Sequence, residues 1–339
     1  DDYKRYSMRL KLDTKLTDKL SVGANLSPSY TDRRRFDGST HDILRQTPWL
    51  PLYHDANTIQ YVDRNIYPDV KIGDYAVQRH FDNYDLYGNG STLVDISNTS
   101  NTNPAAKVLE RDRNDYKFKL FASVYAKYKI LKGLNFKTTI SGDFSNTKRD
   151  RWQGVQASRN GAAAAQLDLS SENRIHLVTD NLFSYNREIG NHEISAIAGF
   201  SAEKFDWAFE SSRGTGYDSD LLQTISAATL IADAQSYEYQ RNLVSYLARV
   251  NYAYDNKYLA TVSVRRDGSS IFGPENKYGT FPAVSVGWNV AQESFLANSN
   301  VVSGLKLRFS YGFSGNDRLN TGGVDPDRSS SSSNLSTGN

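Results

Sequence analysis

Hydrophobic and polar residues alternate along much of this chain at a period of two, the pattern of a β-strand with two different faces. The clearest example is the stretch 258–288, in which two alternating arms flank a connection that contains Gly and Pro. In the first arm Tyr258, Ala260, Val262 and Val264 share one face. The pattern predicts a hairpin with one apolar face, aromatic near its ends, and one mostly polar face.

About ten such strands are predicted along the chain. The connections between them alternate in length, because they are short after the first, third, fifth and seventh strands and long after the second, fourth and sixth. The strand at 116–130 is long for a soluble sheet. The predicted strands are 6–13, 20–30, 116–130, 134–143, 174–187, 192–209, 241–254, 258–265, 283–290 and 305–311.

Two architectures explain strands with two different faces. A soluble sandwich buries the apolar face against a second sheet, whereas a membrane barrel turns it to lipid and turns the polar face to a lumen. The alternation of connection lengths favours the barrel, since barrels have short periplasmic turns and long extracellular loops. The sequence therefore predicts an all-β fold, a transmembrane antiparallel β-barrel, with a Greek-key sandwich as the alternative.

Composition agrees with a barrel. Mean hydropathy is −0.60 and no run of about 18 apolar residues occurs, so transmembrane helices are excluded, whereas barrel strands expose half their residues to water. The 22 Tyr, 15 Phe and 4 Trp suit aromatic girdles or a sugar-binding surface. The absence of Cys excludes disulfides, and 40 basic against 38 acidic residues give no sign of nucleic-acid binding.

Two segments interrupt the strand pattern. The polar segment at about 31–114 is predicted to be a long extracellular loop or an inserted subdomain, because structureless connections of this length are rare. Residues 317–339 are rich in serine and are expected to be a disordered, low-complexity tail. The remaining chain, 1–316, is assigned to the barrel.

Aromatic residues of the long loop are candidates for contact with a ligand or partner, because ring faces beside polar groups suit stacking and hydrogen bonding. The alternative is that they pack a small core within the loop itself. These residues are Trp49, Tyr53, Tyr61 and Tyr67.

No catalytic, cofactor-binding or metal-binding residue is proposed, and the chain is not expected to be an enzyme. The Ser-x-x-Lys matches at 145–148 and 201–204 lie in or beside predicted strands, where residues three apart point to opposite faces. The five histidines show no metal-ligand spacing.

Four motifs carry a resemblance to a known family. They are RDGSS at 266–270, FGPENKYG at 272–279, FPAVSVGW at 281–288 and LKLRFSYG at 305–312. Their order and spacing closely resemble those of SusC/RagA-type TonB-linked (TonB-dependent) outer-membrane transporters.

The resemblance implies a barrel of about 22 strands in the outer membrane of a Gram-negative, Bacteroidota-type bacterium. It also implies an N-terminal plug, a SusD-like surface lipoprotein as partner, and import of oligosaccharides or peptides with energy from TonB. About ten strands are then an internal part of the barrel, without the plug, and the TonB complex would be reached through a missing N-terminal region. The alternative function is a secreted β-rich glycan-binding or adhesin module.

Basic residues on the polar faces of the strands are expected to line the lumen and contact the plug. In the hairpin, Asp255 and Asn256 are expected at the periplasmic rim and 267–280 in a short extracellular loop. The RDGSS and FGPENKYG segments are interpreted as structural elements. The expected lumen residues are Arg9, Lys11, Lys117, Lys119, Arg249 and Arg265.

Overall fold

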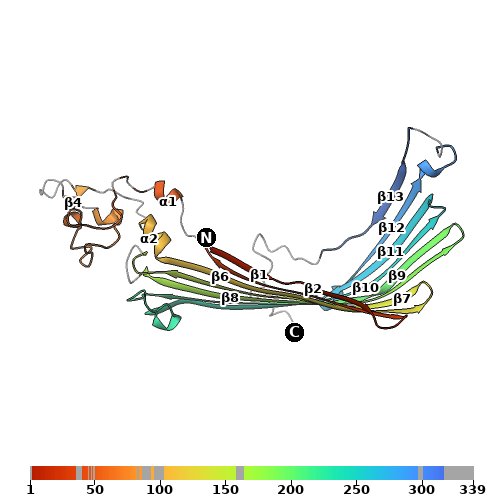
Figure 1. Cartoon of the computed structure of the whole chain (residues 1–339), viewed down its shortest axis with the longest axis horizontal. Coiled ribbons are helices and arrows are strands. Elements are labelled where there is room, and N and C mark those ends of the chain that lie inside the picture. Colours follow the sequence, from red (N-terminus) through yellow and green to blue (C-terminus); the bar gives the residue numbers. More distant parts are fainter. Residues whose placement is uncertain are drawn as a thin grey trace.

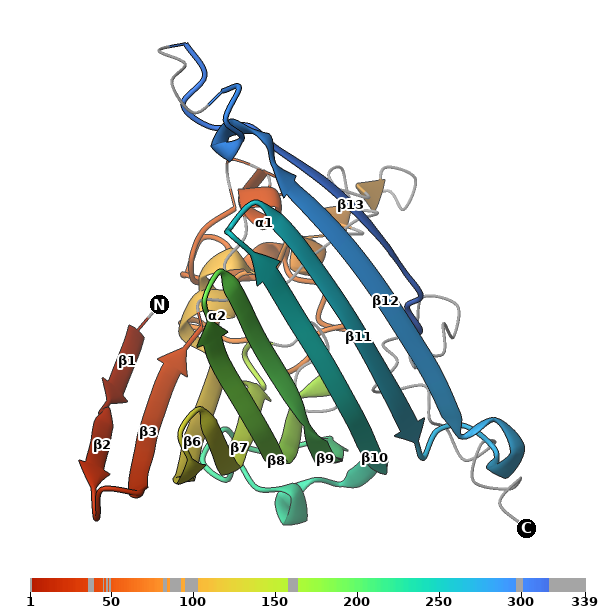
Figure 2. The same cartoon turned by 90° about the vertical axis from the view of Figure 1, so that its right-hand side faces the viewer.

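The computed structural model describes residues 2–35, 40–44, 46, 48, 50–81, 84–85, 93–94, 103–157, 164–296 and 301–316. Most of its regular structure is one antiparallel sheet of 11 strands, in which β1 and β2 both pair with β3 and each later strand pairs with the next sheet strand in the chain (Figures 1 and 2). The sheet contains β1 (Asp2–Ser7), β2 (Leu10–Lys15), β3 (Leu20–Arg34), β6 (Arg111–Leu131), β7 (Leu134–Gln153), β8 (Gln166–Ile189), β9 (His192–Thr215), β10 (Leu230–Tyr254), β11 (Tyr258–Ser269), β12 (Tyr278–Asn289) and β13 (Lys306–Gly312).

The first two strands share one position in the sheet. Ser7 opposes Ser29 and Leu10 opposes Leu26, so both strands continue a single register along β3. The break between them lies opposite Pro28, whose carbonyl accepts from the Met8 N–H at 3.1 Å. Proline has no N–H to return that bond, so the ladder is interrupted there. The sheet therefore has ten positions across its width, as the sequence predicts.

The connections lie on two rims of the sheet. Short turns join β2 to β3, β6 to β7, β8 to β9 and β10 to β11 on one rim, which we name the short rim and which also carries the longer connection 290–305 between β12 and β13. Asp255 and Asn256 both have positive φ, 50° and 53°, the left-handed pair that a tight hairpin turn requires. The opposite, long rim carries the connections 35–110, 154–165, 216–229 and 270–277.

Strands extend much farther toward the long rim than the sequence predicts. β7, β8, β9 and β10 contain 20, 24, 24 and 25 residues. The prediction of a loop between 143 and 174 is therefore wrong, because β7 continues to Gln153 and β8 begins at Gln166. The extensions of β7 and β8 carry polar residues on both faces, so they lack the alternation that marks the rest of each strand.

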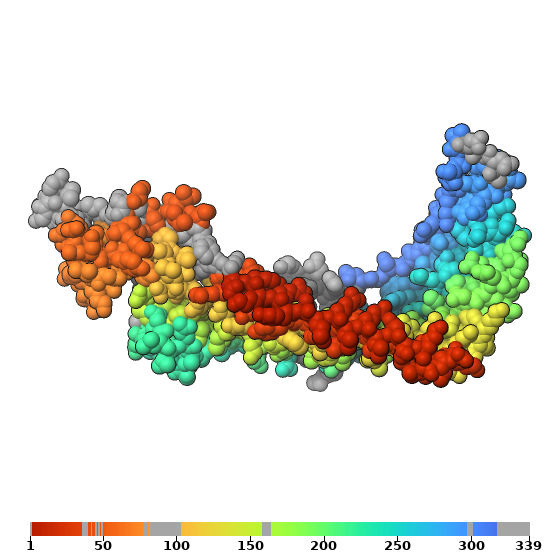
Figure 3. All heavy atoms as spheres, viewed as in Figure 1, coloured from red at the N-terminus to blue at the C-terminus, as the bar shows by residue number. Residues whose placement is uncertain are grey.

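The sheet is strongly curved and open. Loop residues 50–81 at one end and β12 and β13 at the other rise on the same side of it, which leaves a hollow between them (Figure 3). Within the described residues β1, β2 and β13 each have a strand partner on one side only. An open antiparallel sheet of this kind confirms the predicted fold class, part of a β-barrel wall.

Short elements occupy the connections. The strand β3 ends at Arg34 and β6 begins at Arg111, so the long connection is shorter than the predicted 31–114. The predicted tail 317–339 lies outside the described residues. The connections contain α1 (Thr40–Leu44), η1 (Ile59–Tyr61), η2 (Gln78–Phe81), β4 (Tyr84–Asp85), β5 (Leu93–Val94), α2 (Pro104–Leu109), η4 (Ile225–Ala227), η5 (Pro274–Asn276) and η6 (Val290–Gln292).

Candidate functional site

The register places the apolar residues of successive strands on one face, as a belt beside the short rim. Val124 opposes Ile140, and Val250 opposes Val262, which in turn opposes Val284. These side chains face outward from the sheet, and Val262 is 60% exposed. No other layer of the described residues covers this belt, and an exposed apolar surface of this width contacts lipid or a partner.

Aromatic rings border the belt at the short rim. Glu293 fixes two of them, because the Tyr258 hydroxyl donates to its Oε1 at 2.7 Å and the Trp288 Nε1 donates to it at 2.9 Å. Amphipathic rings at the edge of an apolar band are typical of membrane barrels. The rings at this edge are Tyr128, Phe136, Phe183, Tyr185, Tyr252, Tyr258 and Trp288.

The opposite face is polar, and most of the predicted lumen residues lie on it. Lys11, Lys117, Lys119, Arg249 and Arg265 all alternate with the apolar belt residues of their own strands. They are spread over the width of the sheet, so they do not form one cluster.

The sixth predicted lumen residue, Arg9, lies in the break between β1 and β2. Of the other five, Arg265 is the most constrained: its Nε donates to Asp267 at 2.7 Å and its Nη2 donates to the buried Ser245 hydroxyl at 3.0 Å. This contact ties the RDGSS segment to β10.

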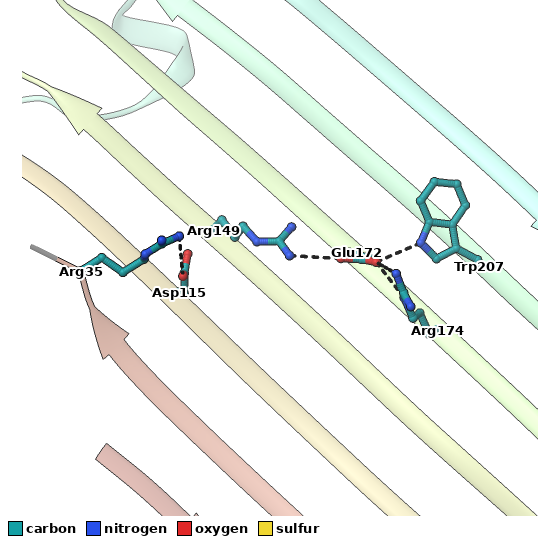
Figure 4. A network of polar contacts seen from close by, with 6 residues as sticks. All are labelled: Arg35, Asp115, Arg149, Glu172, Arg174 and Trp207. Carbon is teal, nitrogen blue, oxygen red and sulfur yellow. Dashed lines mark hydrogen bonds and ion pairs between the residues drawn. The ribbon is translucent and has the colours of Figure 1, made fainter. Parts of the chain in front are cut away.

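A charged network that the sequence reasoning missed joins β7, β8 and β9 on the polar face. Glu172, whose side chain is 14% exposed, accepts from Arg149 Nη2 at 3.3 Å, from Arg174 Nε at 2.7 Å and from Trp207 Nε1 at 3.1 Å (Figure 4). Glu172 falls inside the predicted loop. No sequence signal marks this network, because its members come together only when the strands pair.

A second carboxylate lies on the same face nearby. Glu203 contacts Arg241 and His176, each at 3.0 Å. Aromatic rings flank it on β9 and β10, where Phe205 lies 6.2 Å from Tyr239 between ring centroids. The surface thus combines paired charges with ring faces, which is the chemistry of a polar binding surface.

A shallow depression of about 460 Å³ lies on the polar face between β10 and β13. Two arginines from different strands line it, together with small hydroxyl and amide side chains. The predicted lumen residue Arg249 is one of them. The polar lining includes Arg249, Asn251, Thr261, Ser263, Ser285 and Arg308.

The predicted loop aromatics divide into three groups. Tyr53 and Tyr67 pack within the connection itself, Tyr53 against Tyr75 at 4.9 Å and Tyr67 edge-on against His80 at 4.9 Å. Tyr61 lies in η1 and is 39% exposed. Trp49 lies outside the described residues.

Two buried histidines form the centre of this small loop core. His54 Nε2 and His80 Nδ1 are 2.8 Å apart, and the rings stack at 5.0 Å between centroids. One ring must therefore be neutral and accept from the other. Burial, then the neighbouring His54, lower the pKa of His80 to about 4, and burial also lowers the pKa of His54.

Acidification is expected to loosen this loop core. His80 binds its proton near pH 6.5 when unfolded and near 4 when folded, so the free energy of local unfolding falls by about 1.4 kcal/mol per pH unit between these values. Hydrogen exchange of 51–81, corrected for intrinsic rates, measures this dependence. His80→Gln should flatten it, whereas the control His41→Gln, at an exposed position, should not. Equal pH dependence in both variants would contradict the assignment.

Among the described residues, no group of three or more His, Asp or Glu side chains is arranged to hold a metal ion. The helices among them are all too short or too polar to span a bilayer.

Known proteins resemble this chain in both sequence and fold. It is 32% identical over 212 residues to TonB-dependent receptor P3 of Formosa agariphila, covering 62% of this chain and 21% of that protein. A second TonB-dependent receptor of that organism is 26% identical over 324 residues, covering 93% of this chain and 29% of the relative. TonB-dependent receptor SusC of Bacteroides thetaiotaomicron is 29% identical over 237 residues, 68% of this chain and 23% of SusC.

Among solved structures, the RagAB peptide importer in its open-open state superposes with a TM-score of 0.70 at 23% identity. The match covers 91% of this chain and 32% of that one, and it supports the fold. No family model matches the chain. The chain spans less than a third of each of these relatives. Sequence and fold together show that the chain is similar to SusC/RagA-type TonB-dependent receptors and has the fold of part of their barrel wall.

Proposed function

We propose that the chain forms part of the wall of an outer-membrane importer of oligosaccharides or peptides. The observation that carries this proposal is the continuous apolar belt, exposed on one face of every position in the sheet, with aromatic rings along its edge. Such a face is stable in lipid and costly in water. The apolar belt contacts the bilayer, and the polar face lines the lumen.

The connection lengths give the orientation. The short rim, with Asp255 and Asn256, lies in the periplasm, and the long rim lies outside the cell. Arg9, Lys11, Lys117, Lys119, Arg249 and Arg265 then face the lumen and the plug. A SusD-like lipoprotein covers the extracellular opening, and TonB supplies energy through the plug.

Cysteine labelling tests the orientation, because this segment contains no Cys. Leu221→Cys, on an exposed connection of the long rim, should react with an impermeant maleimide on intact cells. Asn256→Cys should react only after the outer membrane is permeabilised. Equal labelling of both positions on intact cells would refute the topology.

Uptake tests the import itself. Cells with and without the gene receive fluorescent pools of oligosaccharides and, separately, of peptides. An importer gives a gene-dependent internal signal that a protonophore abolishes. A gene-dependent signal that stays on the cell surface despite energisation would instead favour the adhesin alternative.

A further inference from the structure

The strands continue well beyond the apolar belt toward the long rim. On β9 the belt side runs from Ile194 to Ala202 and then changes to Lys204 and Asp206. The polar-face side chains of 111–119, 145–153, 166–176, 203–213 and 233–241 therefore form a wall beyond the bilayer. We name it the long-rim surface.

The long-rim surface is strongly basic on its β6 and β7 part. The opposite face of the same two segments carries Lys148 with Asp112 and Asp150, so the basic excess belongs to one face only. The long-rim surface has six basic side chains there against one acid: Arg111, Arg113, Lys117, Lys119, Arg149 and Arg151 against Asp115.

Two of these arginines face each other directly. Arg113 opposes Arg151 across the β6 and β7 pair, an arrangement of like charges that destabilises a sheet. Among the described residues, the buried Nε of Arg151 has no hydrogen-bond acceptor. Asp168 on β8 opposes Arg151 from the other side, but it is bonded to Arg213. An anionic group bound beside the two guanidinium groups would offset their repulsion further and supply bidentate acceptors.

The β9 and β10 part of the surface carries aromatic rings. Phe209 opposes Tyr237 with centroids 6.3 Å apart and ring planes 27° apart, and Trp207 lies 6.1 Å from Phe209 with planes only 8° apart. The hydrogen bond from Trp207 to Glu172 fixes this orientation. Tyr237 is 40% exposed, so a ring face is open to a ligand.

We propose that the long-rim surface binds an anionic oligosaccharide. Sugar rings stack on Phe209 and Tyr237, and carboxylate or sulfate groups meet Arg113, Arg149 and Arg151. Arg151 on β7 is level with Arg213 on β9, so it lies two strand spacings across the sheet and four residues along it from Phe209, roughly 16 Å away, a distance that a short oligosaccharide spans. This inference rests on the proposed import function and names its substrate class.

Backbone pairing favours a sugar over an acidic peptide. Extended peptides bind sheets by hydrogen-bonding to a free edge. On the long-rim surface β7, β8 and β9 are each paired on both sides along their length, so recognition there depends on side chains alone. Residues 230–241 of β10 pair with β9 only, and a peptide added to that free edge would lie on the side of Tyr237 away from the basic strands. Ring faces and forked guanidinium groups then suit a chain of charged sugars.

Calorimetry on the purified full-length protein in detergent tests the proposal with defined probes. Hexagalacturonate and a chondroitin sulfate hexasaccharide are the anionic probes, maltohexaose is the neutral one, and hexaglutamate is the acidic peptide. At least one anionic sugar should bind tenfold more tightly than maltohexaose and hexaglutamate, and added salt should weaken it. No preference for either anionic sugar, or a preference for hexaglutamate, would overturn the proposal.

Paired variants localise the binding. Arg151→Gln and Tyr237→Leu should each weaken the preferred sugar at least fivefold, whereas Lys148→Gln, on the opposite face of β7, should leave it unchanged. Equal effects of Arg151→Gln and Lys148→Gln would also overturn it. Gene-dependent uptake is measured in a separate experiment. Failure of the anionic-sugar preference leaves the import proposal standing, whereas the absence of gene-dependent uptake contradicts both proposals.

Discussion

Replacing Val284 by lysine is expected to destabilise the membrane-inserted barrel by about 2 to 4 kcal/mol, the cost of a cation near the middle of the bilayer. Val284 lies between Val262 and Tyr311 in the apolar belt and is 43% exposed in the isolated sheet. The full-length protein is refolded into lipid vesicles, and the folded fraction is followed against urea. The variant should unfold at a clearly lower urea concentration.

The matched control is Ser285→Lys, one residue away at the same depth. Ser285 lies on the polar face and lines the depression beside Arg308. A lysine there has water and space, so its effect should stay within about 1 kcal/mol. Equal destabilisation by the two substitutions would show that the apolar belt does not face lipid.

Removing the carboxylate of Glu172 is expected to cost about 2 to 3 kcal/mol of stability. Glu172→Ala leaves Arg149, Arg174 and Trp207 without their shared acceptor, and a partly buried donor that loses its partner is costly. The cost stays below that of a fully buried pair because the Arg174 side chain is 42% exposed. The urea midpoint and the fluorescence of Trp207 report the loss.

Glu210→Ala provides the control, because Glu210 lies on the opposite face of β9 and is exposed. It should change the midpoint little. Glu172→Gln keeps an oxygen acceptor and should have an intermediate effect. A midpoint for Glu172→Ala that matches the Glu210 control would mean that the network contributes nothing to stability.

The sequence predicts the sheet where its two faces differ and misses it where they do not. On β6 every second residue from Phe118 to Tyr128 is apolar or aromatic, and that part is predicted correctly. On β7 beyond Phe144, and on β8 before Arg174, both faces carry polar residues. Period-two alternation requires one apolar environment, so these extensions have the composition of loops.

Residues of the polar face are likewise predictable only where apolar and polar positions alternate along a strand. Alternation alone places Lys117 and Arg249 on the polar face, because each is flanked by belt residues in its own strand. The Glu172 network depends instead on which residues become opposite when three strands pair. That register is fixed by the turns and by strand length, neither of which a local pattern contains.

From β3 onward, the strands of the sheet lie in the order in which they follow one another in the chain, and this order affects how the sheet assembles. Most neighbours in the sheet are joined by a connection of modest length, so pairing can proceed hairpin by hairpin with small losses of chain entropy. The junction of β3 and β6 differs, because the chain between Arg34 and Arg111 must close before these strands align. Loop closure there costs roughly 2 to 3 kcal/mol more than at a tight turn. This pairing is therefore expected to be the slow step in forming this part of the wall, and the small histidine-centred core within that connection shortens the free chain that must close.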